Sequence, residues 1–161
     1  MSRSGSIRSI VFAVAAVACW ATVTGVAGAR SSSVCGTVAP STAALAKALG
    51  ASSFAPISYP GTPAYCGVGG AGPVTARIYL YSKSAASRVA PQLAASFGQR
   101  AARKQTLAGL GSGATLEYVP GDTTTVIAFF TAGSHFIVIV GSEAKNAQVV
   151  ALARAVHAKL A

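Results

Sequence analysis

Acidic side chains are scarce in this chain. Its 161 residues include three Asp and Glu against 13 Lys and Arg, so the net charge is +10 at pH 7. The three are Glu117, Asp122 and Glu143. A glycosidase needs two carboxyl groups facing one another, and Glu117 and Asp122 only flank a tight turn. The shortage of carboxylates therefore argues against glycosidase chemistry and against a calcium site.

Histidine is rarer still, since His135 and His157 are the only two. No Cys, His, Asp and Glu cluster has metal-ligand spacing, so we expect no metal. No serine stands in a G-x-S-x-G nucleophile elbow, and Ser112 is a loop serine between two glycines. The sequence favours a non-catalytic protein without a cofactor. The alternative is a small secreted hydrolase that uses His135 and a loop serine such as Ser112.

The N-terminus holds a long uncharged and mostly apolar segment, which follows a basic start and ends in Ala27-Gly28-Ala29. This pattern predicts a secretory signal peptide over residues 1–29, with an uncleaved membrane anchor as the alternative. Lipidation at Cys19 ranks second or third, because Trp20 follows it where small polar residues are usual. We therefore expect a secreted, periplasmic or envelope protein, with a membrane tether left open.

Two cysteines, Cys35 and Cys66, remain after the signal peptide. An even pair in an exported chain predicts one structural disulfide, and a pair of free buried thiols is the blander alternative. Residues 30–34 are polar and are expected to be a flexible lead-in. Residues 35–161 are then a single domain.

Alternation in VTARIYLY, residues 74–81, predicts a half-buried strand. Ala76, Ile78 and Leu80 fall on one face, and Arg77, Tyr79 and Tyr81 fall on the other. Three further strands are expected over 114–119, 124–130 and 135–140, separated by turn residues and meandering antiparallel. The last two are apolar on both faces, as in central strands covered by helices.

Three helices are expected. The first is capped by Ser41 and ends at Gly50, and the second follows Ser82 or Ser84. The third is capped by Ser142. Their apolar stripes are Val89, Leu93 and Phe97 in the second helix, and Val149, Leu152, Val156 and Leu160 in the third. The prediction is an α+β sandwich, an antiparallel sheet of about four to six strands packed with three helices and preceded by a signal helix.

The chain resembles small secreted or lipoprotein-like envelope proteins of high-GC bacteria. The residues that carry the resemblance are Cys35-Gly36, the Ala-rich helix ending Leu49-Gly50, Cys66-Gly67, and the segment AGLGSGATLEYV, residues 108–119. Such proteins have no assigned function, and the resemblance implies an envelope location and a PsbP-like α/β sandwich. The family often has Gly-Leu-Gly-Asp where this chain has Gly109 to Ser112, so Ser112 stands in place of an aspartate. Any role of the aspartate carboxylate is therefore not carried over to this chain.

The segment GVGGAG, residues 67–72, fits the dinucleotide fingerprint G-x-G-x-x-G. That fingerprint requires a helix after the glycines, whereas here Pro73 and an expected strand follow. No acidic residue lies about twenty positions further on, around VAPQLAAS. The glycines therefore predict a flexible turn beside the disulfide, and no nucleotide cofactor.

Positive charge is the main functional indication. Arg100, Arg103 and Lys104 are expected to cluster at a helix end, and Arg77, Tyr79 and Tyr81 share a strand face. These six are the candidate ligand-binding residues, and the alternative for Arg77 is an ion pair with Glu117 across strands. The sequence predicts an exported binding or interaction module for an anionic or amphipathic envelope ligand, either a polymer or a glycolipid. A protein partner in the envelope is the alternative, and nucleic acid ranks below both.

Overall fold

The computed structural model describes residues 33–51, 55–96, 102–122 and 124–161, which form seven strands and four α-helices. The helices are α1 (Val34–Val38), α2 (Thr42–Leu49), α3 (Ala86–Ser96) and α4 (Asn146–Leu160), with a 3-10 turn η1 (Lys83–Ala85) before α3. The strands are β1 (Ile57–Tyr59), β2 (Tyr65–Gly69), β3 (Thr75–Ser82), β4 (Arg103–Thr106), β5 (Thr115–Tyr118), β6 (Val126–Ala132) and β7 (His135–Ser142). The signal peptide predicted over 1–29, with Cys19, lies outside the described residues.

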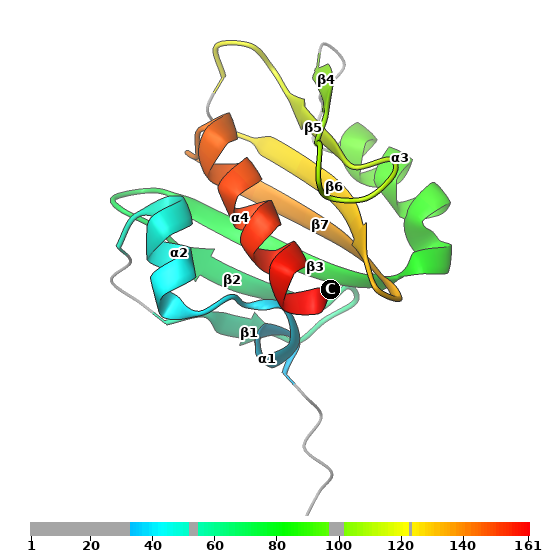
Figure 1. The fold of residues 1–161 in the computed structure, drawn as a ribbon. Helices are drawn as coiled ribbons and strands as arrows, with labels where there is room; N and C mark the ends of the chain where they lie inside the picture. Colours follow the sequence, from blue (N-terminus) through cyan, green and yellow to red (C-terminus); the bar gives the residue numbers. More distant parts are fainter. Residues whose placement is uncertain (1–32, 52–54, 97–101, 123) are drawn as a thin grey trace, which may run out of the picture.

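The strands form one antiparallel sheet in the order β1-β2-β3-β7-β6-β5-β4 (Figure 1). The predicted α+β class is confirmed, and so is the meander of β5, β6 and β7. The predicted counts of four to six strands and three helices are too low. The sequence patterns miss the short helix α1 and the strands β2 and β4.

Strand β4 corrects the prediction of a helix running through Arg103 and Lys104. Helix α3 is assigned up to Ser96, and Arg103–Thr106 pairs with β5 at the edge of the sheet. The local sequence, rich in Ala, Arg and Lys, favours a helix, but pairing with β5 places these residues in a strand. Because every residue of β4 is exposed, the strand has no apolar alternation by which it could be recognised.

The glycine segment is also more regular than predicted. Gly67 and Gly69 belong to strand β2, and Gly70 to Gly72 make the turn into β3. Only the second half of the segment is therefore the predicted turn.

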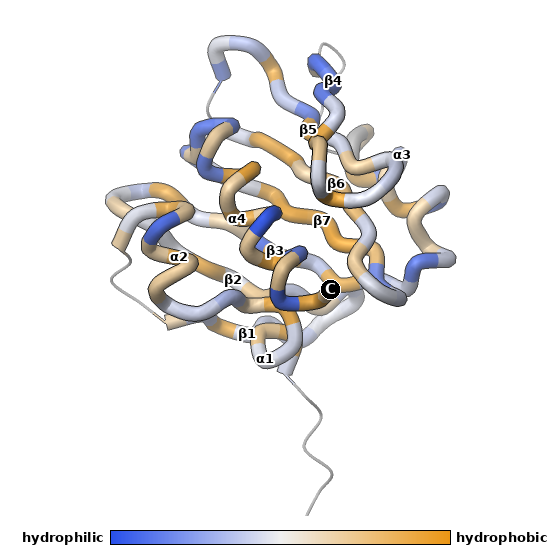
Figure 2. The backbone as a smooth tube through the Cα atoms, viewed as in Figure 1, coloured by the Kyte–Doolittle hydropathy of each residue, from blue (hydrophilic) through white to orange (hydrophobic). Residues whose placement is uncertain are grey.

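Helices α1, α2 and α4 cover one face of the sheet (Figure 1). The buried stripe of α4 contains Val149, Leu152 and Val156, as its spacing predicts. Strands β6 and β7 are buried along nearly their whole length, and Figure 2 shows them as mostly apolar. This confirms the prediction of central strands covered on both faces.

Helix α3 lies on the opposite face of the sheet from α2 and α4 (Figure 1). Val89 and Leu93 of α3 pack against a second apolar cluster that includes Phe129 and Phe136. Phe97, the third residue of the predicted stripe, lies outside the described residues. Because Tyr59 and Arg77 are exposed, this face is open toward the β1 edge of the sheet.

The predicted capping residue is confirmed for α2 and corrected for α4. The Ser41 side chain accepts a hydrogen bond from the Ala44 amide at 3.3 Å, as a cap of α2 should. Ser142, the predicted cap of α4, is instead the last residue of β7. Helix α4 begins after Lys145, whose amide donates to the Gln148 side chain at 2.9 Å.

The hairpin turn between β2 and β3 packs closely on the end of α2. A Cβ atom at Gly70 would collide with the Leu49 carbonyl oxygen and lie 2.7 Å from the Leu49 Cβ. The Ala71 amide also donates to the Leu49 carbonyl at 3.1 Å. Only glycine leaves room for this approach of two backbones.

We therefore predict that Gly70→Ala lowers the free energy of unfolding by about 3 kcal/mol, because the added methyl group meets backbone that cannot move aside. Gly72→Ala is the control. Its Cβ would meet nothing within 4 Å, but its φ of +65° should cost about 1 kcal/mol. Urea unfolding of both variants measures the difference, and a smaller loss for Gly70→Ala than for Gly72→Ala would contradict the packing argument.

Candidate ligand-binding face

A row of tyrosines crosses the open part of the sheet face that carries α3. Strand register places Tyr59 opposite Tyr65 and Tyr65 opposite Tyr79. The ring centroids of these pairs are 4.7 and 5.2 Å apart, and the Tyr79 and Tyr81 centroids are 6.4 Å apart. We call Tyr59, Tyr65, Tyr79 and Tyr81 the tyrosine row. It continues from Tyr81 to Phe136, so it runs from the sheet edge to the apolar cluster beneath α3.

The alternation of β3 sets the second half of this row. Tyr79 and Tyr81 lie on the same face as Arg77, as the sequence pattern predicts. Tyr79 is 9% exposed, Tyr81 is half-buried and Arg77 is exposed. Binding of a ligand by these three residues stays a prediction.

Arg77 contacts the tyrosine row rather than a carboxylate. Its guanidinium carbon lies 5.7 Å from the centroid of the Tyr65 ring, a cation–π geometry. The predicted alternative, pairing with Glu117, is wrong, because β7 and β6 lie between β3 and β5. Glu117 instead forms an ion pair with Lys104 at 3.4 Å.

The predicted basic cluster has a different setting from the one expected. Arg103 and Lys104 lie on the exposed edge strand β4, not at a helix end, so the helix dipole plays no part in their charge. Arg100 lies outside the described residues.

An open groove of about 750 Å³ lies where β3 continues beyond β2. Tyr65 and Tyr79 form the last β2–β3 pair. Beyond it, within the described residues, Leu80 to Ser82 pair with β7 and not with β2. Helix α3 and the turn before β2, Thr62 to Ala64, provide the two sides of the groove.

The groove combines an apolar wall with polar groups. Ala85 and Leu93 contribute the apolar surface, while Arg88, Gln92 and Tyr81 contribute the polar groups. Arg88 is exposed, and no carboxylate is among the described residues that line the groove. Such an arrangement suits a ligand with an apolar part and a negative charge.

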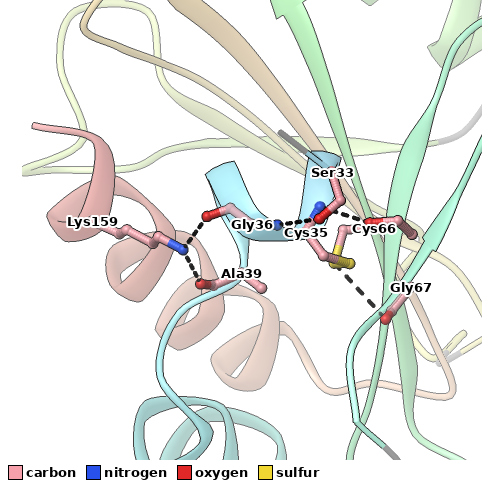
Figure 3. Close-up of a disulfide and its surroundings, with 8 residues drawn as sticks. Ser33, Cys35, Gly36, Ala39, Cys66, Gly67 and Lys159 are labelled. Atoms are coloured by element: carbon pink, nitrogen blue, oxygen red, sulfur yellow. Dashed lines mark hydrogen bonds between the residues drawn. A yellow bond between two sulfur atoms is a disulfide. The ribbon is translucent and has the colours of Figure 1, made fainter. Parts of the chain in front are cut away.

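The disulfide predicted between Cys35 and Cys66 is confirmed (Figure 3). It joins α1 to β2, and Cys66 is the residue after Tyr65 of the tyrosine row. The Cys35 amide also donates to the Ser58 side chain of β1 at 3.0 Å. The disulfide therefore ties α1 to the two strands that carry Tyr59 and Tyr65.

The residues of the alternative hydrolase do not form a linked pair in the described structure. Ser112 is exposed in a loop, His135 begins β7, and no hydrogen bond joins them within the described ranges. His157 packs against Phe130 with a ring separation of 6.1 Å. Among the residues that the structure describes, no three His, Cys, Asp or Glu side chains come together as a metal site would require.

Asp122 has a local structural role, as its turn position predicts. The Thr124 side chain and amide donate to its carboxylate at 2.6 and 2.7 Å. These two hydrogen bonds lower the pKa of Asp122.

Comparisons with protein-family models, with curated proteins and with solved structures found no match. Within 33–51, 55–96, 102–122 and 124–161, no helix is long and apolar enough to cross a bilayer.

Tyr81 provides a test of the buried end of the tyrosine row. Burial raises the pKa of its hydroxyl above the ordinary value of 10.0, and Tyr79 acts in the same direction. Its neutral form therefore stabilises the fold fully below pH 10, and this contribution is lost as the pH rises toward the folded-state pKa. We predict that Tyr81→Phe removes one late-ionising group from the alkaline absorbance titration and flattens the fall in stability above pH 10. A titration that is unchanged by the substitution would contradict this placement.

The disulfide gives a second prediction. Its sequence separation is 31 residues, and a loop of this length stabilises the fold by roughly 3.5 kcal/mol through the unfolded chain. Cys35→Ala with Cys66→Ala should therefore lose about that much in urea unfolding. Dithiothreitol should lower the stability of the wild type and leave that of the double variant unchanged. Equal stability of the oxidised and reduced wild type would contradict a stabilising role of the disulfide.

Proposed function

We propose that this protein is an exported, non-catalytic binding module of the cell envelope. Its ligand is an anionic amphiphile, such as an envelope glycolipid, and the groove between α3 and β3 holds the apolar part. The observation that carries the proposal is the groove itself, which brings apolar wall and arginine together on one open surface. Its volume of about 750 Å³ is in the range of small-molecule sites in proteins.

The apolar part of the ligand would lie along Ala85 and Leu93. Both residues are half-buried and pack at the margin of the apolar cluster under α3. The wall of the groove thus continues this apolar cluster of the protein. An alkyl chain placed there is removed from water on several sides, which contributes about 0.8 kcal/mol for each methylene that becomes buried.

The charged part of the ligand would lie at Arg88. A guanidinium group offers several donors in a plane and suits a carboxylate or phosphate. With a net charge of +10, the chain as a whole also attracts anions. A neutral amphiphile gains neither of these effects, so the proposal requires the ligand to be anionic.

Location outside the cytoplasm is part of the same proposal. A structural disulfide between Cys35 and Cys66 is compatible with an oxidising compartment. The signal peptide predicted over 1–29 and the resemblance to secreted envelope proteins support export.

The proposal predicts a preference for dodecyl phosphate over dodecyl maltoside, which has the same tail and a neutral head. In isothermal titration calorimetry the phosphate should bind more tightly. Arg88→Gln should weaken dodecyl phosphate binding about tenfold, the effect of losing one charge-assisted hydrogen bond, and leave dodecyl maltoside binding unchanged.

Arg154→Gln is the matched control, because Arg154 is also an exposed helical arginine but lies on α4. It should bind dodecyl phosphate as the wild type does. Equal binding of the two detergents, or equal losses in the two variants, would count against an anionic amphiphile in this groove.

A further inference from the structure

A second, smaller hollow lies at the other end of the tyrosine row. It has a volume of about 190 Å³ and shares no lining residue with the groove. Gly67 forms part of its floor, and in the sheet register Gly67 lies opposite Arg77. The next residue of β2 on this face is Gly69, opposite Thr75. Because Gly67 has no side chain, the backbone of β2 forms the floor of the hollow at this point.

Tyr59 and Tyr65 form the aromatic side of the hollow. Their rings are nearly parallel, with an interplanar angle of 14°, and Tyr59 remains 41% exposed. A Cβ atom at Gly67 would lie 2.9 Å from Cε2 of Tyr59, so glycine at this position lets the Tyr59 ring lean over β2. The exposed face of an aromatic ring carries partial negative charge and attracts C–H groups that carry partial positive charge. The C–H faces of a pyranose ring are such groups.

Arg77 forms the opposite side and supplies the only cation among the residues that line the hollow. Its guanidinium is held beside the Tyr65 ring at 5.7 Å and stays exposed. In the described part of the chain, the one ion pair joins Lys104 and Glu117. No carboxylate of these residues therefore lies within ion-pair distance of Arg77. Arg77 is therefore free to bind a carboxylate of a ligand through two parallel hydrogen bonds.

The single cation also narrows the class of ligand. A nucleic-acid strand is held by a track of several basic side chains along its backbone. The lining of this hollow offers one arginine, two tyrosines and small residues, which fits one ring with one negative charge.

We propose that this hollow binds an acidic pyranose, a hexuronate residue of an envelope saccharide. The C–H face of the sugar ring lies against the exposed face of Tyr59, which is backed by Tyr65, and its carboxylate binds the Arg77 guanidinium. This hollow is separate from the groove between α3 and β3, and binding of the saccharide does not depend on the groove.

A galacturonate trisaccharide and its methyl ester provide the test, because they differ in charge and share the pyranose rings. In isothermal titration calorimetry with the oxidised protein, the acid should bind at least about tenfold more tightly than the ester. Arg77→Gln should remove that difference. Tyr59→Ala should weaken the binding of both saccharides.

Two control variants separate this site from the rest of the surface. Arg88→Gln in the groove and Lys104→Gln on β4 should bind the acid as the wild type does, and the thermal unfolding midpoint confirms that each variant folds. The proposal is overturned if the acid and the ester bind equally or not at all, or if Arg77→Gln binds the acid as the wild type does. It is equally overturned if Lys104→Gln weakens acid binding as much as Arg77→Gln, because charge alone would then explain the affinity.

Discussion

The covalent link between Cys35 and Cys66 is the constraint on which the edge of this fold depends. It fixes α1 against β2, and the Cys35 amide binds Ser58 of β1 at 3.0 Å. From the other side, the Lys159 ammonium group donates to the carbonyl oxygens of Gly36 and Ala39 at 2.9 and 2.6 Å (Figure 3). The first helix is thus tied to the edge strand β1, to its neighbour β2 and to the last helix. Since β1 has only three residues, such ties help to hold Tyr59 in place.

The two faces of the sheet then differ in what they can do. One is covered by α1, α2 and α4 and carries the larger apolar cluster. On the other, α3 covers only part of the surface, so the tyrosine row passes from a buried end to an exposed one. Arg77 lines the hollow and Tyr81 lines the groove. The two residues lie four positions apart on β3, which is a distance of about 13 Å along the strand.

Local sequence patterns predicted those helices and strands whose own residues show an apolar alternation, a cap or an apolar stripe. The alternation of 74–81, the Ser41 cap and the stripe of Val149, Leu152 and Val156 each follow from residues close in sequence. The short exposed strand β4 follows from pairing with β5, which no local pattern contains. Arg77, Tyr79 and Tyr81 could be predicted as one face, but the alignment of Tyr59 and Tyr65 beside them depends on the register of two hairpins. The groove depends on where β2 begins, and the segment before it, which contains Pro60, Gly61 and Pro63, has no alternation that marks this position.

The central claim is that the face carrying α3, not the one carrying α2 and α4, binds the ligand. The most direct measurement is a map of backbone amide chemical-shift changes in the ¹⁵N-labelled protein during titration with dodecyl phosphate. The account predicts that the largest changes fall in 80–93, along the end of β3 and the first turns of α3. Changes concentrated around Lys47 and Arg154, between α2 and α4, would contradict it.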